Sequence, residues 1–153
     1  MKKDVIQGFK GEYSFLSPFY PSRISYEGNI FKSVIHFYVF HKTYNDNEKA
    51  LILSKQTPYE IYNLGKNLKF KSKEWKNIKE RVMFTGYVLY LNQNSDFTKS
   101  LLETSNSQLI HQIIPPDKYW GTDQSTGEGR NRLGAILSTI RYIFFKIIKK
   151  ETE

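Results

Sequence analysis

The stretch "KSVIHFYVFHKT" contains one residue able to do polar chemistry at the end of an apolar stripe. Its pattern predicts a helix that begins at Ser33 and continues to Thr43. Helical spacing places Ile35, Val39 and Lys42 on one face, since residues i, i+4 and i+7 share a side. The sequence therefore predicts a single cation at the end of a stripe that carries two β-branched hydrocarbons.

A second candidate site is the loop "STGEGRN", which leads into the last predicted helix. The first N–H groups of a helix and its dipole favour anions. Arg130 and Arg132 add positive charge at this point. We therefore expect that a phosphate of a ligand binds here.

Other chemistries are not supported by the residue spacing. His36 and His41 are five residues apart, which is roughly 140° around a helix, and no carboxylate cluster accompanies them, so no metal site is predicted. The absence of cysteine excludes a thiolate nucleophile and fits a reducing cytosol. No catalytic triad follows from spacing, and no cofactor is expected.

Composition indicates one soluble, cytoplasmic domain of 153 residues. The N-terminus has no signal-peptide pattern, and the apolar run 142–148 is too short to span a bilayer. The net charge of +8 should attract nucleotides, nucleic acid or phosphorylated small molecules. For the lysine-rich segment 66–81, a solvated surface is favoured over a nucleic-acid track. The sequence does not indicate an oligomeric state.

The periodicity predicts an α+β, mostly α-helical fold with a small N-terminal β-hairpin in "RISYEGNIFK". "TPYEIYNLG" carries a capping box and a glycine that should end its helix at position 65. Helices are further expected at about 72–91 and 96–103, followed by a strand or buried extended segment in "QLIHQII". A last amphipathic helix, at about 130–149, should dock on the core with its apolar stripe.

Five pieces in order resemble the NADAR family over about residues 9–141. They are "FKGEYSFLSPFYPSRISYEG", "TPYEIYNLG", "EWKNIKERVM", "DKYWG" and "GEGRNRLGAIL". The resemblance implies a single NADAR-like domain over residues 1–153. It also implies an N-glycosidase related to enzymes that act on riboflavin-biosynthesis intermediates or remove ADP-ribose from guanine.

The resemblance also implies site residues. In that family, a glutamate, a glutamine and a lysine of the helix after the hairpin face the ligand, and the matching positions here are Ile35, Val39 and Lys42. Asp117 is the implied catalytic residue. The implied ligand-binding residues are Ile35, Val39, Lys42, Trp75, Trp120, Gly129 and Asn131, to which the charge at the start of the last helix adds Arg130. Without the resemblance, both tryptophans would be interpreted as core residues.

Hydrolysis of an N-glycosidic bond needs a carboxylate near the oxocarbenium-like transition state, and isoleucine cannot supply one. The favoured hypothesis is a reader or sponge that binds an ADP-ribose-like or N-ribosylated nucleotide but has lost most activity. One alternative is an active N-glycosidase that uses Asp117 or a relocated Glu12, Glu27 or Glu128. A second is a structural relic that binds a partner. Modified nucleic acid is a further candidate ligand, and no membrane contact is expected.

Overall fold

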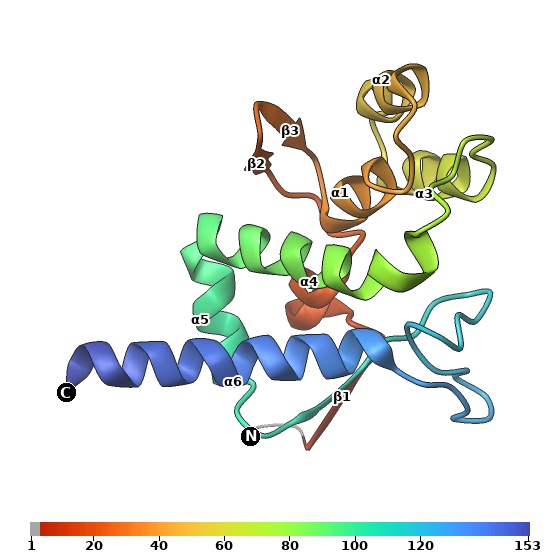
Figure 1. Cartoon of the computed structure of the whole chain (residues 1–153). Coiled ribbons are helices and arrows are strands. Elements are labelled where there is room, and N and C mark those ends of the chain that lie inside the picture. Colours follow the sequence, from red (N-terminus) through yellow and green to blue (C-terminus); the bar gives the residue numbers. More distant parts are fainter. Residues whose placement is uncertain (1–3) are drawn as a thin grey trace. The chain divides into compact units, whose positions relative to one another are not determined.

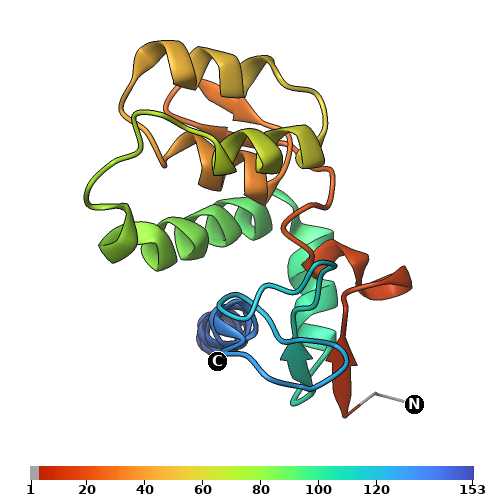
Figure 2. The ribbon, with the colours of Figure 1, turned by 90° about the vertical axis from the view of Figure 1, so that its right-hand side faces the viewer.

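The computed structural model describes residues 4–153, which form two compact units (Figures 1 and 2). The central unit is residues 18–93, and the terminal unit combines residues 4–17 with 94–153. The central unit contains β2 (Ile24–Tyr26), β3 (Asn29–Phe31), α1 (Val34–Phe40), α2 (Asp46–Ser54), α3 (Pro58–Lys66) and α4 (Trp75–Gln93). The terminal unit contains β1 (Val5–Gln7), a 3-10 helix (Gly11–Leu16), α5 (Ser95–Glu103), β4 (Gln108–Ile110) and α6 (Arg132–Thr152). The predicted α+β, mostly helical class is confirmed.

The central unit begins with the predicted hairpin. β2 and β3 pair antiparallel, with Ile24 opposite Phe31, and both of these side chains are fully buried. Glu27 and Gly28 form the tip with φ angles of 46° and 78°. Two successive positive φ angles are typical of the tight turns that match strand twist. The "EG" pair in the sequence is therefore a genuine turn signal.

Helix α1 runs through the interior of the central unit. The Ser33 side chain, at the residue where the sequence predicts the start of the helix, caps it by accepting the His36 N–H, and all seven residues of the helix are buried. His36 lies between two backbone groups: its Nδ1 accepts the Lys32 N–H at 3.0 Å, and its Nε2 lies 3.1 Å from the Ile52 carbonyl oxygen. This histidine therefore joins the hairpin end and α2 to α1.

Helix α3 has the predicted capping box between Thr57 and Glu60. The expectation that Gly65 ends this helix is wrong, because α3 continues to Lys66 and is capped by Asn67. A Cβ at position 65 would lie 2.9 Å from Cγ2 of Val39. The glycine therefore serves close packing of α3 against α1, and not termination of the helix.

The terminal unit is built around the parallel pair β1 and β4, in which Ile6 lies opposite Leu109. β4 confirms the extended segment that the sequence predicted in "QLIHQII". α5 and α6 pack against each other, and α6 also contacts β4. The predicted helix at 96–103 corresponds to α5 within one residue.

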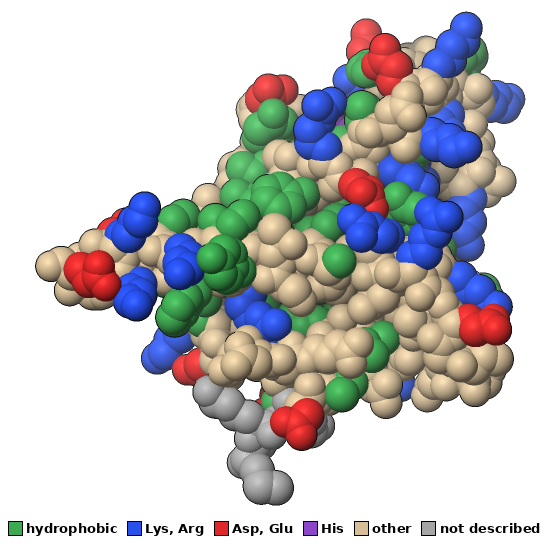
Figure 3. All heavy atoms as spheres, turned by 60° about the horizontal axis from the view of Figure 1, so that its bottom comes forward, with side chains coloured by type: hydrophobic (Ala, Val, Ile, Leu, Met, Phe, Trp, Pro, Cys, Tyr) green, Lys and Arg blue, Asp and Glu red, His purple; other side chains and the backbone are tan. Residues whose placement is uncertain are grey.

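Helix α6 confirms only half of the predicted apolar stripe. Leu133, Ile136, Leu137 and Ile140 are buried, but Ile147 and Ile148 are 47% and 42% exposed. The expectation that the whole stripe docks on the core is therefore wrong for its last turns. Toward the C-terminal end of α6, Figure 3 shows hydrophobic side chains next to lysines at the surface. No helix within residues 4–153 combines the length and the apolar character needed to cross a membrane.

Candidate functional site

The two hydrocarbon positions of the predicted site lie in the interior of the central unit. Ile35 is 3% exposed, and Val39 is completely buried against Gly65. Neither side chain carries a polar atom. This part of the predicted site therefore supplies shape and an apolar surrounding, but no proton donor or acceptor.

Lys42 lies beyond the end of α1, which corrects the prediction that the helix reaches Thr43. The helix ends at Phe40, and His41 is its C-cap. The imidazole Nδ1 of His41 lies 2.7 Å from the Phe37 carbonyl oxygen in the last turn. The Lys42 N–H donates to the Val39 carbonyl, which continues the turn. The lysine is thus placed by a turn and not by helical periodicity.

The ammonium of Lys42 contacts an aromatic cluster. Its Nζ lies 5.2 Å from the centre of the Tyr38 ring and 5.9 Å from that of Trp75, and 3.5 Å from the Gly65 carbonyl oxygen. Tyr38 and Trp75 pack edge to face at 4.8 Å. A cation over such rings is stabilised by their quadrupoles. The structure therefore brings the side chains of Lys42 and Trp75 together.

Sequence reasoning missed Tyr38 and the role of Gly65 in this cluster. Tyr38 lies four residues before Lys42, and the predicted continuation of the helix to Thr43 would have placed the two side chains on one face. The contact with Gly65 spans 23 residues, and no local signal indicates it.

In the terminal unit, Asp117 shapes the turn of "DKYWG". Its Oδ1 accepts the N–H groups of Tyr119 at 2.9 Å and Trp120 at 2.8 Å, and its carbonyl accepts the Gly121 N–H. Trp120 is 9% exposed and packs edge to face with Tyr119. The carboxylate therefore has a clear structural role, which coexists with any role in chemistry.

This role predicts how two variants of Asp117 differ. Asp117→Ala should lower the free energy of unfolding by about 1–2 kcal/mol, because two N–H groups lose their acceptor. Asp117→Asn should lose less than half as much, since the amide oxygen can still accept both hydrogen bonds. Urea unfolding measures both values. Equal losses in the two variants would show that the charge, and not the acceptor geometry, is what matters.

The start of α6 differs from the expected anion site. The N–H groups of residues 130–133 donate to the carbonyls of Lys118, Gly121, Tyr119 and Trp120, at 2.7–3.1 Å. The prediction that backbone N–H groups here are free for a phosphate is therefore wrong for these four residues. An anion at this place would depend on side chains such as that of Arg130, whose guanidinium carbon lies 5.7 Å from the centre of the Tyr119 ring.

Asn131 fastens this segment to β4. Its Nδ2 donates to the Leu109 carbonyl at 2.8 Å, and its Oδ1 accepts the His111 N–H at 3.0 Å. The residue has a φ of 48°, a left-handed conformation that asparagine tolerates well. Asn131 thus hydrogen-bonds to β4 as a neighbouring strand would.

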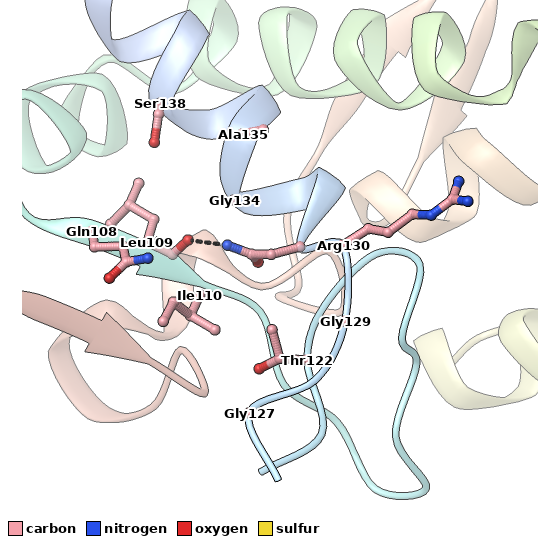
Figure 4. A pocket seen from close by; sticks show the side chains of 11 residues that line it. Gln108, Leu109, Ile110, Thr122, Gly127, Gly129, Arg130, Gly134, Ala135 and Ser138 are labelled. Atoms are coloured by element: carbon pink, nitrogen blue, oxygen red, sulfur yellow. Dashed lines mark hydrogen bonds between the residues drawn. The ribbon is translucent and has the colours of Figure 1, made fainter.

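Three of the predicted residues line one pocket of about 460 Å³ in the terminal unit: Gly129, Arg130 and Asn131. Sequence reasoning missed the pocket's neutral polar side chains, which include Gln108, Thr122 and Ser138. In Figure 4, the Arg130 side chain extends away from Gln108 and Ser138. The pocket itself is therefore surrounded mainly by neutral hydrogen-bonding groups and glycine backbone.

His111 lies next to this region and is 4% exposed. Burial lowers the pKa of His111 to about 4, although the negative charge of Asp117 acts in the opposite direction. The imidazole is therefore neutral at pH 7.

The predicted site residues form two groups, one in each unit. Ile35, Val39, Lys42 and Trp75 lie in the central unit, and Asp117, Trp120, Gly129, Arg130 and Asn131 lie in the terminal unit.

Comparison with known proteins identifies the family. Residues 7–144 match the family model described as the NADAR domain. The chain therefore belongs to the NADAR domain family, and one family domain spans both units.

Similar proteins occur in bacteria and in a virus. The N-glycosidase YbiA of Shigella flexneri is 28% identical over 131 residues, which cover 85% of this chain and 81% of that protein. The N-glycosidase R617 of Acanthamoeba polyphaga mimivirus is 31% identical over 105 residues, or 61% of this chain and 60% of that one. The NMR structure of Escherichia coli YbiA is similar, with a TM-score of 0.86 at 24% identity. The match covers all of this chain and 90% of the YbiA chain, and it supports the fold.

Proposed function

We propose that this protein binds an ADP-ribose-like or N-ribosylated nucleotide and has lost most or all N-glycosidase activity. The observation that carries the proposal is the burial of Ile35 and Val39, at 3% and 0% exposure, at the positions where the family resemblance implies a glutamate and a glutamine. An acid–base group contributes on the order of a hundred- to ten-thousandfold to the rate, and hydrocarbons contribute none of it.

The three glutamates considered as replacements interact with near neighbours in the sequence. Glu12 hydrogen-bonds to Tyr13, and Glu27, at the hairpin tip, to Tyr26. Glu128 pairs with Lys118 at 3.1 Å, and both side chains are largely exposed. These contacts support the view that none of the three carboxylates has taken over the missing role.

Binding is supported by polar groups that persist in both units. Lys42 supplies a cation next to two aromatic rings, which suits a phosphate or an electron-rich base. The terminal-unit pocket supplies hydroxyl and amide groups, which suit a ribose. Each of these two sets of groups suits one part of a nucleotide, and neither supplies a carboxylate that would cleave it.

The main alternative is an active N-glycosidase, which the names of the relatives favour. In that reading Asp117 would act as the acid or base. Its use as a turn acceptor for Tyr119 and Trp120 leaves its second carboxylate oxygen as the chemically relevant atom.

Two assays test the proposal. Titration with ADP-ribose, followed by tryptophan fluorescence and melting temperature, should show saturable binding to the native chain. Release of free base from ribosylated nucleotides should be at least about a hundredfold slower than in the double variant Ile35→Glu with Val39→Gln.

Ile30 is 47% exposed and provides a control. The variant Ile30→Glu adds a carboxylate to the same unit and should not restore hydrolysis. Melting curves with excess nucleotide establish that the double variant is folded. Turnover by the native chain at ordinary enzyme rates would refute loss of activity, and absence of any nucleotide response would favour the partner-binding relic.

A further inference from the structure

Residues 68–73 of the central unit form a loop between α3 and α4 (Figures 1 and 2). Phe70 is 62% exposed. Leaving a large apolar ring in water gains nothing for folding. The ring is therefore accessible to a binding partner from solvent.

The loop is held by side chains from the segment between α1 and α2. The carboxylate of Glu48 accepts the N–H groups of Lys69 at 2.8 Å and Phe70 at 3.1 Å. The Thr43 hydroxyl lies 2.8 Å from Glu48 Oε1 and 3.1 Å from the Phe70 carbonyl oxygen. The Ser72 N–H also donates to the Lys42 carbonyl at 2.8 Å. Hydrogen bonds to a carboxylate are stronger than neutral ones, so the loop is preorganised.

The same frame places a second ring next to Phe70. Thr43 and Lys71 form an antiparallel bridge, so that Tyr44 and Phe70 are the next residues along the two paired segments. Tyr44 is 64% exposed, and its hydroxyl lies 3.3 Å from Glu74 Oε2. Two exposed rings on one rigid frame form a small stacking surface.

Positive charge surrounds these rings. Residues 42–79 contain nine lysines and four acidic residues. Lys69, Lys71 and Lys73 are exposed around Phe70, and the Lys49 ammonium lies 5.9 Å from the centre of the Tyr44 ring. Of the four acidic residues, Glu48 accepts from the loop backbone, Glu60 belongs to its capping box, and Glu74 lies at the Tyr44 hydroxyl, so that lysines still outnumber them. The surface around the rings is therefore cationic.

We propose that Tyr44 and Phe70, together with Lys49, Lys69, Lys71 and Lys73, bind single-stranded nucleic acid. Unpaired bases stack on the two rings, and the long lysine side chains contact the phosphates on either side of a stacked base. A duplex does not offer its base faces, and an acidic peptide has no flat π systems to match the rings. The surface lies wholly in the central unit and does not depend on the proposed nucleotide site.

Fluorescence anisotropy with a labelled oligothymidylate of about 20 nucleotides tests this proposal. Phe70→Ala should weaken binding on the order of tenfold. Replacing Lys69, Lys71 and Lys73 by glutamine should flatten the plot of log affinity against log salt by about 2, since each lost single-strand phosphate contact removes about 0.7. The replaced side chains are exposed, so far-UV circular dichroism should remain unchanged.

Helix α6 provides matched controls of the same chemistry. Phe145 is 54% exposed, so Phe145→Ala should change binding less than about twofold. Glutamine at Lys146, Lys149 and Lys150 removes the same charge elsewhere and should leave most of the salt slope. Four results would overturn the proposal: no binding at low salt, control variants as weak as the loop variants, duplex bound as tightly as the single strand, or a polyglutamate peptide bound as tightly as the oligonucleotide.

Discussion

Lowering the pH from 6.5 to 4 should remove about 3 kcal/mol of folding free energy for each of two buried histidines. His36 is fully buried and His111 is 4% exposed. Burial lowers the pKa of each imidazole from 6.5 to about 4. The unfolded chain therefore takes up protons below pH 6.5, which the folded chain accepts only near pH 4. The contribution of the two neutral histidines to the folding free energy is fully present above pH 6.5 and decreases as the pH falls toward 4.

The expected slope is about 1.4 kcal/mol per pH unit for each histidine between these limits. Urea unfolding at a series of pH values measures it. His36→Gln and His111→Gln should each reduce the slope by about 1.4 kcal/mol per pH unit, because each variant lacks one group that takes up a proton on unfolding. Both variants are also expected to be less stable at pH 7. A native slope that neither variant changes would contradict this account.

Replacing Gly134 by alanine should reduce the free energy of unfolding by about 2–4 kcal/mol. A Cβ at this position would collide with the Leu109 carbonyl oxygen and the Asn131 side chain. These two groups are hydrogen-bonded to each other, so the added methyl group must either break that bond or push α6 away from β4. Helix propensity alone would predict the opposite sign, a gain of about 1 kcal/mol.

The neighbouring exposed residue provides the control for this prediction. Ala135→Gly, in the same turn of α6, should cost only the propensity difference of about 1 kcal/mol. Denaturant unfolding of both variants compares packing with propensity directly. If Gly134→Ala were neutral or stabilising, α6 would have room to move, and the close contact with β4 would not be essential.

These results also bear on the proposed function. Gly134 and Asn131 hold the residues of the terminal-unit pocket against β4, so Gly134→Ala should weaken any ligand bound in that pocket. The loop that carries Phe70 lies in the other unit, and its binding to single strands should be unaffected in folded protein. The two proposals can thus fail independently of each other.

Local signals in the sequence determined the caps, the turns and the class of fold. The start of a helix at Ser33, the capping box of Thr57 and Glu60, and the hairpin turn around Gly28 were all predicted, because each depends on residues within one turn of chain. The ordered motifs also identified the NADAR family. The catalytic role of Asp117 and the ligand-binding roles of Trp75 and Trp120 stay predictions.

Tertiary structure alone decided where those local rules are overridden. Gly65 lies inside α3 because Val39 packs against it, and the N–H groups at the start of α6 are taken by the carbonyls of residues 118–121. Glu48 organises a loop more than twenty residues away and thereby holds Phe70 in solvent. Each of these outcomes depends on contacts between residues distant in sequence, and such contacts carry no periodicity or motif from which they could be predicted.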